Sequence, residues 1–151
     1  MAQELVIGID VGGQTTKCGV VDARGDVLSQ TVVRSDSHTD VKPYIDELAV
    51  ALKKLIADAD AEGSVRGIGV GAPNAKDGLR FYRGILKYWR SLLKPGGYLL
   101  FEVGEGQAEA VKELVLSAGF ASASTRKDTL GVERVVVGKM YDEDGELYSG
   151  F

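Results

Sequence analysis

The chain has 151 residues, of which 44% are hydrophobic and 26% charged, and its formal net charge is −4. These values are typical of one globular domain; they exclude wholesale disorder and, without a basic excess, argue against a nucleic-acid binder. The single cysteine, Cys18, excludes an internal disulfide, and with one histidine, His38, it argues against a Cys/His metal cluster. No apolar run approaches the ~18 residues of a membrane span. We therefore expect a cytoplasmic protein with no membrane partner.

The first half begins with three predicted strands joined by tight, glycine-marked turns. These strands cover residues 5–10, 16–22 and 27–33. Short apolar segments joined in this way are typical of an antiparallel β-meander. From residue 40 to 62 apolar residues recur at spacings of three and four, which predicts a helix with Asp40 as its N-cap and Gly63 as its stop. A glycine-rich buried strand follows at residues 65–71.

The second half alternates helices with strands. We expect a helix from Asp77 to residue 93, a strand at 98–103, a helix at 106–118, and strands at 121–126 and 133–141. The connections from Val70 to Phe101 and from Phe101 onward each contain a helix, so the strands that they join are expected to be parallel neighbours. The sequence thus predicts an α/β fold with a single mixed, mostly parallel sheet of order 3-2-1-4-5-7-6 and helices on both faces. Strand 2 and the penultimate strand are expected to run antiparallel to the rest.

The segment from Ile9 to Lys17 is the part of the sequence that most clearly indicates a binding function. A carboxylate at a strand end followed by two glycines lets backbone N–H groups approach a phosphate, and nearby hydroxyl and ammonium groups can meet its oxygens. The candidate cofactor-binding residues are Asp10, Gly12, Gly13, Thr15, Thr16 and Lys17. No helix follows, so this is not a Walker A loop. A tight hairpin turn that needs a positive φ at one glycine explains the same residues.

Residues 4–75 resemble the N-terminal part of the ROK family of repressors and sugar kinases, in the actin-like ATPase superfamily. The resemblance rests on Ile7-Gly8-Ile9-Asp10-Val11-Gly12-Gly13, on residues 17–22 and on residues 68–74. It implies that the six candidate residues form the phosphate loop of an ATP-dependent hexose kinase. Gln14 stands where that family more often has Thr. The family's sugar-binding Asn-Asp pair, zinc motif and second lobe have no counterpart in the sequence, so we assign no catalytic residue.

Residues 77–139 resemble the C-terminal part of class I release-factor glutamine N5-methyltransferases. The resemblance rests on residues 77–83 and on Leu93-Lys94-Pro95-Gly96-Gly97-Tyr98-Leu99-Leu100-Phe101-Glu102-Val103-Gly104, and shorter motifs continue it to about residue 139. That family's S-adenosylmethionine loop and Asn-Pro-Pro-Tyr motif have no counterpart. Residues 71–74 occupy the strand end where the latter motif would lie, with different side chains. This half therefore offers no catalytic residue either.

Together the two resemblances predict one domain, residues 1–151, built from fragments 1–75 and 76–141, with 142–151 as a tail or edge strand. The expected function is that of an engineered chimeric scaffold without selected catalytic activity, cofactor or partner. The alternative is a module that binds nucleotide or phosphate weakly, with Mg-ATP as the implied cofactor. An active sugar kinase would need its base and second lobe from another subunit. Self-association through the sheet edges is left open.

One helix face in the second half is predicted to be basic. Its residues are Arg80, Arg83, Lys87, Arg90 and Lys94, at spacings of three and four. A solvated outer face explains this stripe, and binding of phosphates or of an acidic partner is the alternative. We interpret Tyr82 and Trp89 as core, His38 as surface, and Cys18 as packed in a strand.

Overall fold

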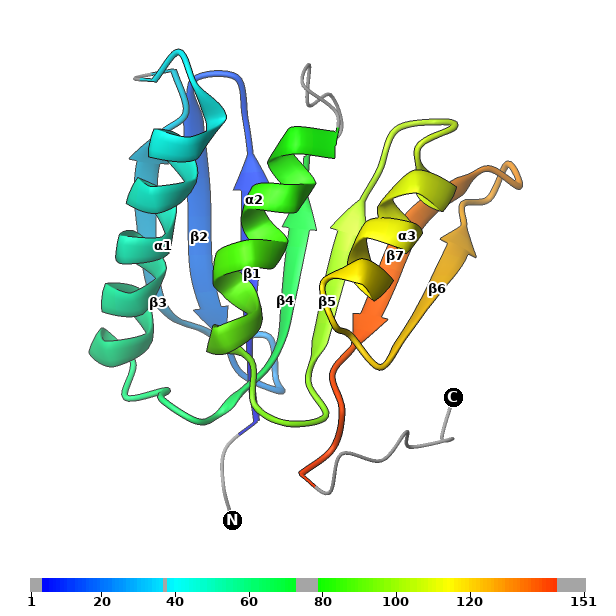
Figure 1. Ribbon diagram of the computed structural model, residues 1–151. Helices are drawn as coiled ribbons and strands as arrows, with labels where there is room; N and C mark the ends of the chain where they lie inside the picture. Colours follow the sequence, from blue (N-terminus) through cyan, green and yellow to red (C-terminus); the bar gives the residue numbers. More distant parts are fainter. Residues whose placement is uncertain (1–3, 37, 73–78, 144–151) are drawn as a thin grey trace.

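A single seven-stranded sheet, of order β3-β2-β1-β4-β5-β7-β6, organises the structure (Figure 1). The computed structural model describes residues 4–36, 38–72 and 79–143, without the side chains of Trp89 and Ser91. The strands are β1 (Leu5–Val11), β2 (Thr15–Val21), β3 (Val27–Arg34), β4 (Val65–Gly71), β5 (Tyr98–Glu102), β6 (Ser122–Lys127) and β7 (Glu133–Lys139). The predicted α/β class and strand order are confirmed.

The two strands expected to run against the rest are confirmed, but the expectation of a mostly parallel sheet is wrong, because four of the six strand pairings are antiparallel. β5 and β6, which α3 joins, are not neighbours as expected, because β7 lies between them. β2 and β7 are antiparallel to both of their neighbours, and the other five strands share one direction. Parallel pairing is confined to β1–β4 and β4–β5, at the centre of the sheet. The carboxyl ends of β1, β4 and β5 therefore meet at one edge.

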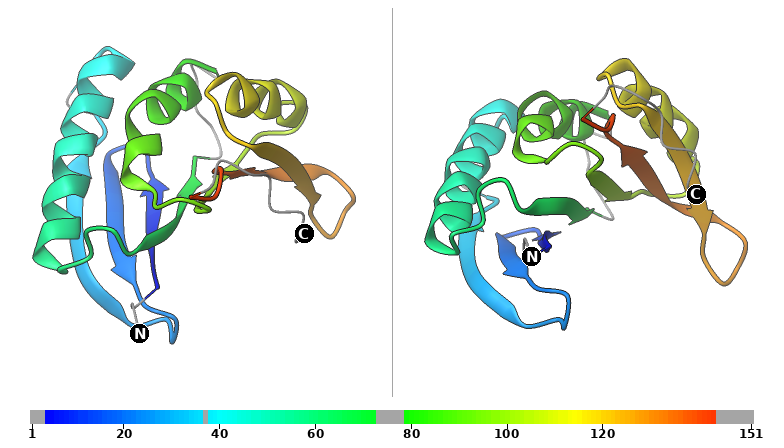
Figure 2. Two further views of the ribbon diagram at one scale, coloured as in Figure 1. Left: turned by 60° about the horizontal axis from the view of Figure 1, so that its bottom comes forward. Right: turned by 90° about the horizontal axis from the view of Figure 1, so that it is seen from below.

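All three described helices lie on the same face of the sheet, which corrects the expectation of helices on both faces (Figure 2). They are α1 (Val41–Asp58), α2 (Leu79–Trp89), which continues into the 3-10 turn η1 (Arg90–Leu92), and α3 (Ala108–Ser117). The crossovers β3–β4, β4–β5 and β5–β6 all move across the sheet in one direction. Right-handed crossovers that move in one direction place their helices on one face. We call the other side, which carries Val6, Gly69 and Leu100, the open face.

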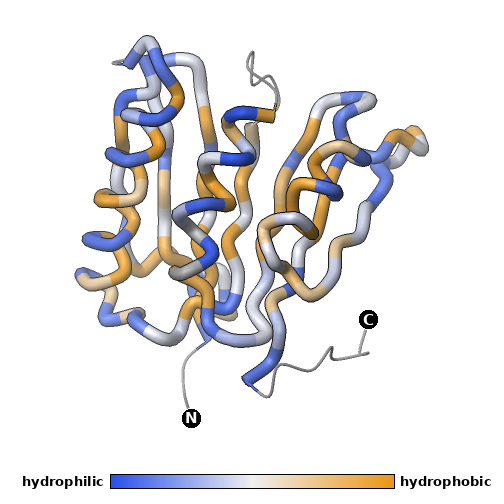
Figure 3. The backbone as a smooth tube through the Cα atoms, in the orientation of Figure 1, coloured by the Kyte–Doolittle hydropathy of each residue, from blue (hydrophilic) through white to orange (hydrophobic). Residues whose placement is uncertain are grey.

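The core lies between the helices and the sheet. Strand alternation turns Ile7, Ile68 and Phe101 toward the helices, and one cluster of buried hydrophobic residues joins both halves of the chain. Figure 3 shows the matching alternation of hydrophobic and hydrophilic residues along α1. Rings also link the halves. Tyr44 of α1 stacks on Phe81 with centroids 6.3 Å apart, and Tyr82 meets Phe101 of β5 edge-on at 5.0 Å.

The ends of α1 differ from the sequence prediction. Asp40 has the extended backbone of an N-cap residue, but its side chain makes no capping hydrogen bond. The helix ends at Asp58 rather than near residue 62. Asp60 takes the left-handed conformation (φ 52°), and the Ala61 N–H donates back to the Ile56 carbonyl at 2.9 Å. Aspartate tolerates this conformation better than most side chains, so the chain turns three residues before Gly63. The predicted Asp77 cap, the fragment junction near Asn74–Asp77 and the tail beyond residue 143 lie outside the described residues.

Candidate functional site

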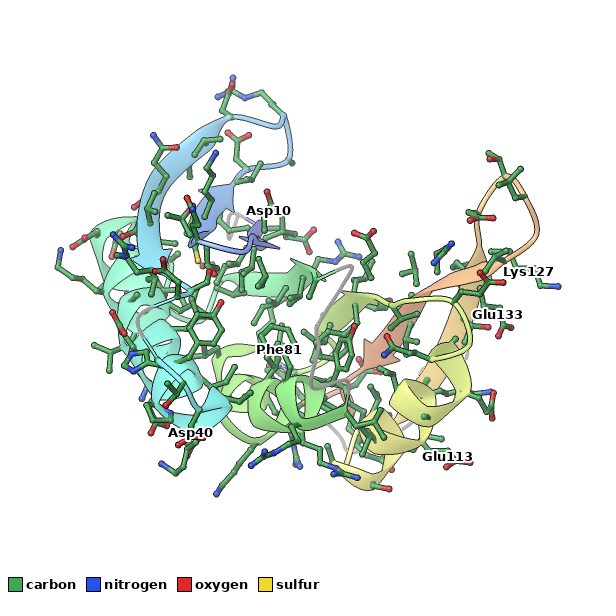
Figure 4. The ribbon with its side chains drawn as sticks, turned by 90° about the horizontal axis from the view of Figure 1, so that it is seen from above. Asp10, Asp40, Phe81, Glu113, Lys127 and Glu133 are labelled. Atoms are coloured by element: carbon green, nitrogen blue, oxygen red, sulfur yellow. The ribbon has the colours of Figure 1, made fainter. Side chains whose placement is uncertain are left out.

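Asp10 and Lys17 are the two charged side chains of the predicted phosphate loop, and both lie on the open face. Asp10 is directly opposite Lys17 of β2 on one side and Gly71 of β4 on the other. Both side chains are exposed, and with Gln30 of β3 they line a shallow hollow of about 400 Å³. Figure 4 shows Asp10 at the carboxyl edge of β1, on the side away from the helices. A carboxylate, an ammonium group and an amide therefore surround one hollow.

The two glycines of the loop form a hairpin turn. The Gly12 N–H donates to the Thr15 carbonyl oxygen over 2.9 Å, and a Cβ on Gly12 would lie 2.8 Å from that oxygen. Gly12 is therefore required by the turn itself. A Cβ on Gly13 would meet nothing within 4 Å, and Thr15 is exposed.

Thr16 points away from the other loop residues, into the core. Its hydroxyl is hydrogen-bonded to the Ser35 hydroxyl at 2.7 Å and to the Tyr44 hydroxyl, and its side chain is fully buried. Burial raises the pKa of Tyr44, so that phenol stays protonated and able to donate. The six predicted residues are thus divided between the two faces of the sheet. Their binding of phosphate or Mg-ATP stays a prediction.

A second group at the carboxyl edge was missed by the sequence analysis. Glu102, the last residue of β5, is exposed on the open face, and its Oε2 lies 3.2 Å from where a Cβ on Gly71 would be. Its backbone carbonyl accepts a hydrogen bond of 3.0 Å from the buried Tyr82 hydroxyl. The sequence feature that could have predicted it is side-chain alternation: Glu102 lies two residues after Leu100, so both side chains point to the same face of the sheet. Asp10 and Glu102 therefore flank Gly71 in one row across the sheet.

The loop that follows β5 is held by its own polar contacts. The Gly104 N–H donates to Oε1 of Gln107 at 3.0 Å, and the Val103 N–H donates to the Arg134 carbonyl at 2.8 Å. Gly106 has φ 82°, which glycine adopts without strain. Hydrogen bonds therefore hold the backbone at Glu102 and at the two residues that follow it.

An apolar hollow of about 680 Å³ occupies the open face next to these groups. Its floor includes Val6, Gly67, Tyr98 and Leu100. Val6 and Leu100 are 42% and 38% exposed, which is unusual for strand residues at the centre of a sheet. The open face can therefore accept apolar groups beside the acidic row.

The remaining candidates do not form a further centre. Cys18 is buried as predicted, and burial raises the pKa of its thiol to about 11. His38 Nε2 lies 2.5 Å from a Glu47 carboxylate oxygen in a hydrogen bond at the surface. Within residues 4–36, 38–72 and 79–143, no group of three or more His, Cys, Asp or Glu side chains can hold a metal ion. Nor is any helix in these segments long and apolar enough to cross a membrane.

Comparison with known proteins finds similar proteins of two kinds. No family model matches. The release factor glutamine methyltransferase of Clostridium acetobutylicum is 35% identical over 117 residues, covering 75% of this chain and 39% of that protein. The Geobacter sulfurreducens enzyme of the same name is 44% identical over 64 residues, 42% of this chain and 22% of that protein. Among solved structures, an inorganic polyphosphate/ATP-glucomannokinase from Arthrobacter is 31% identical over 46% of this chain and 28% of its own, with a TM-score of 0.39.

The curated matches confirm the methyltransferase resemblance and overturn the expected function. The relatives in the curated comparison are named as methyltransferases, so the expectation of an engineered scaffold without activity, and of a chain that is not an enzyme, is wrong. The missing motifs do not outweigh a similarity that extends over 117 residues. The chain spans 39% of the first of these relatives and 22% of the next two.

Proposed function

We propose that the chain acts in methyl transfer to a protein glutamine, and that its residues at the carboxyl ends of β4 and β5 form the acceptor side of the site. The observation that carries the proposal is the 35% identity over 117 residues with a release factor glutamine methyltransferase. The similarity covers 75% of the chain, which is more than residues 77–139, on which the methyltransferase resemblance rests. On this basis we propose for this chain the activity and the substrate that the name of the relative gives.

Glu102 is the described side chain best suited to an amide acceptor. A glutamine amide nitrogen is a weak nucleophile, and it must lose a proton once it gains a methyl group. A carboxylate that accepts a hydrogen bond from the amide N–H can orient the nitrogen and take up that proton. Glu102 is exposed at the carboxyl end of β5, beside the bare backbone of Gly71, which leaves room for an approaching side chain.

The resemblance implies S-adenosylmethionine as the methyl donor, but the described residues do not form a binding site that fits it. The resemblance implies a glycine-rich loop for it, whereas the Gly12–Gly13 turn joins two antiparallel strands and closes on the Thr15 carbonyl. We therefore derive no step through the donor and assign only the acceptor side.

Methylation of a bacterial release factor tests the proposal. The purified chain is incubated with the release factor and methyl-labelled S-adenosylmethionine, and label at glutamine is located by mass spectrometry. We expect incorporation above a protein-free blank, and a rate at least about tenfold lower for Glu102→Gln, the size of a modest general-base effect. Glu105→Gln, at an exposed acid in the next loop, is the matched control and should keep its rate. No incorporation by the unaltered chain would contradict the proposal.

We also propose that the chain joins segments of the two families within one sheet. This is supported by the 31% identity with the glucomannokinase over 46% of the chain, alongside the methyltransferase similarity. The shared hydrophobic core and the ring contacts from Tyr44 to Phe101 explain how such segments can fold together. If so, residues 4–75 expressed alone should fail to give a cooperative thermal transition, because they lack the core partners Tyr82 and Phe101.

A further inference from the structure

The outer surface of α2 carries four basic side chains, which we call the α2 basic face. They are Arg80, Arg83, Lys87 and Arg90, all exposed. Nitrogen-tipped side chains project from this side of α2 in Figure 4. Lys94, the fifth residue of the predicted stripe, lies beyond η1 and pairs instead with Glu4 at 3.7 Å. The face thus extends about 15 Å along the helix, at 1.5 Å per residue.

Counter-charges are arranged differently on the neighbouring helix. Two of the three α1 lysines are paired within their own helix, Lys42 with Asp46 at 2.7 Å and Lys54 with Asp58 at 3.3 Å. No such ion pair reaches the α2 basic face from the described residues. Asp46 of α1 interacts electrostatically with Lys87, but its carboxylate already accepts a hydrogen bond from Lys42. Like charges three and four residues apart repel, and Asp46 offsets only part of this charge, so the face keeps an excess of positive charge.

Apolar hollows flank the basic face on both sides. Between α2 and α3 a hollow of about 330 Å³ has Leu86 and Leu114 on its walls, with Arg83, Lys87 and Arg90 around it. The residues that α3 contributes, which include Ser117 and Ala118, are uncharged. Between α1 and α2 a smaller hollow of about 200 Å³ is lined by Ile45 and Tyr88, among others. Basic side chains therefore surround two open hollows whose walls are partly apolar.

Arg90 fixes the geometry at one end of this surface. Its Nη1 donates to the Ala118 carbonyl at the end of α3, and a Cβ on Gly119 would lie 2.5 Å from the same nitrogen. The guanidinium thereby bridges η1 and α3 and holds the two walls of the larger hollow together. The recognition surface is thus preorganised, which lowers the entropic cost of binding.

We propose that the α2 basic face binds an acidic, partly apolar peptide segment of a partner protein. Carboxylates of the segment pair with Arg83 and Lys87, and an apolar side chain enters the hollow between α2 and α3. The apolar walls favour a peptide over a nucleic acid, whose backbone would leave them unfilled. The chain's net charge of −4 also disfavours a polyanion that must approach the whole molecule. This inference does not depend on the proposed methyl transfer.

Fluorescence anisotropy with the full chain tests the proposal. The probe is a short labelled peptide of repeating Glu-Glu-Leu, compared with a Lys-Lys-Leu peptide and with labelled polyuridylate RNA. We expect saturable binding of the acidic peptide that weakens with added salt. Arg83→Glu/Lys87→Glu should weaken it at least about tenfold, and Leu114→Ala should weaken it less, because the one removes charge pairing and the other only apolar contact.

The charge-matched control is Lys53→Glu/Lys54→Glu, which makes the same change on the exposed side of α1. It should retain binding, and thermal melts of all variants should show that each is folded. Equal loss in both double variants would mean that only overall charge matters and would overturn the proposal. Absence of binding, or tighter binding of polyuridylate than of the acidic peptide, would overturn it as well.

Discussion

The Tyr82 hydroxyl donates a hydrogen bond of 3.0 Å to the backbone carbonyl of Glu102, so the first turn of α2 is fastened to the end of β5. The same ring meets Phe101 edge-on and is fully buried. A single side chain thus positions the helix with the basic face and the strand end with the acidic candidate. The packing of Tyr82 therefore affects the proposed acceptor side, because a shift of this strand end would move the Glu102 carboxylate.

Replacing Tyr82 by Phe should remove the hydrogen bond and keep the ring packing. We expect the free energy of unfolding to fall by about 1 kcal/mol, the usual net value of one such bond. Urea denaturation with an unchanged slope measures it. Tyr141→Phe, at an exposed ring, is the control and should change little. An unchanged stability in Tyr82→Phe would mean that the Glu102 carbonyl finds an equally good donor in water.

Alkaline pH should destabilise the fold through its buried acids, chiefly Tyr82 and Cys18, and the raised pKa of buried Tyr44 acts in the same direction. Burial raises the pKa of the Tyr82 phenol from 10.0 to about 12 and that of the Cys18 thiol from 9.0 to about 11. In each case the unfolded chain loses the proton first, so the stabilising contribution is complete below the unfolded pKa and is lost as pH rises through the folded one. Urea midpoints should therefore fall between about pH 9 and 12.

Variants separate the two acids. Cys18→Ala should flatten the lower part of this decline and Tyr82→Phe the upper part. A decline that is identical in all three proteins would assign the alkaline loss to other groups.

Strand order was predictable because it rests on local chemistry. Tight turns at Gly12–Gly13 and at Arg24–Gly25 force neighbouring antiparallel strands, and each crossover helix forces a parallel return. The placement of all helices on one face follows from that same order, because right-handed crossovers that never reverse direction put their helices on the same side of the sheet. The end of α1 was not predictable from the glycine rule, because Asp60 takes the left-handed position.

Side-chain alternation along the strands is the sequence feature that predicts which way the residues of the candidate site point. Thr16 has the parity of Cys18 and Val20, two buried residues, so its hydroxyl had to point into the core. Glu102 has the opposite parity to Phe101 and had to point outward. What no local pattern contains is the hydrogen-bond network with Ser35 and Tyr44, since these residues are brought to Thr16 only by the fold.

Acid should destabilise the hairpin between β2 and β3 through Asp22. Its carboxylate accepts the N–H groups of Arg24 at 2.9 Å and Asp26 at 3.0 Å, and the latter bond is the main cause that lowers the pKa of Asp22. A lowered folded pKa means that the stabilisation is present above the unfolded value of 3.8 and is lost as pH falls. Asp22→Asn should therefore have a lower Tm than the unaltered chain at neutral pH and approach it near pH 2.

Thermal melts across the acid range measure this difference, with Asp58→Asn at an exposed helix position as the control. A gap in Tm between Asp22→Asn and the unaltered chain that stays constant down to about pH 2 would exclude the carboxylate charge as its cause.

Gly138 and Gly69 offer a matched pair on opposite faces of the sheet. A Cβ on Gly138 would lie 2.7 Å from Cγ1 of Val115 and 3.1 Å from Cδ1 of Phe120, so α3 must shift to admit it. A Cβ on Gly69 would meet nothing within 4 Å, because it points to the open face. We expect Gly138→Ala to lower the free energy of unfolding by about 1–3 kcal/mol, as overpacked cores do, and Gly69→Ala to change it by less than about 0.5 kcal/mol. Urea denaturation of the two variants decides the matter: if Gly69→Ala is the more damaging change, then the open face is covered in solution and the helices are not the sheet's only cover.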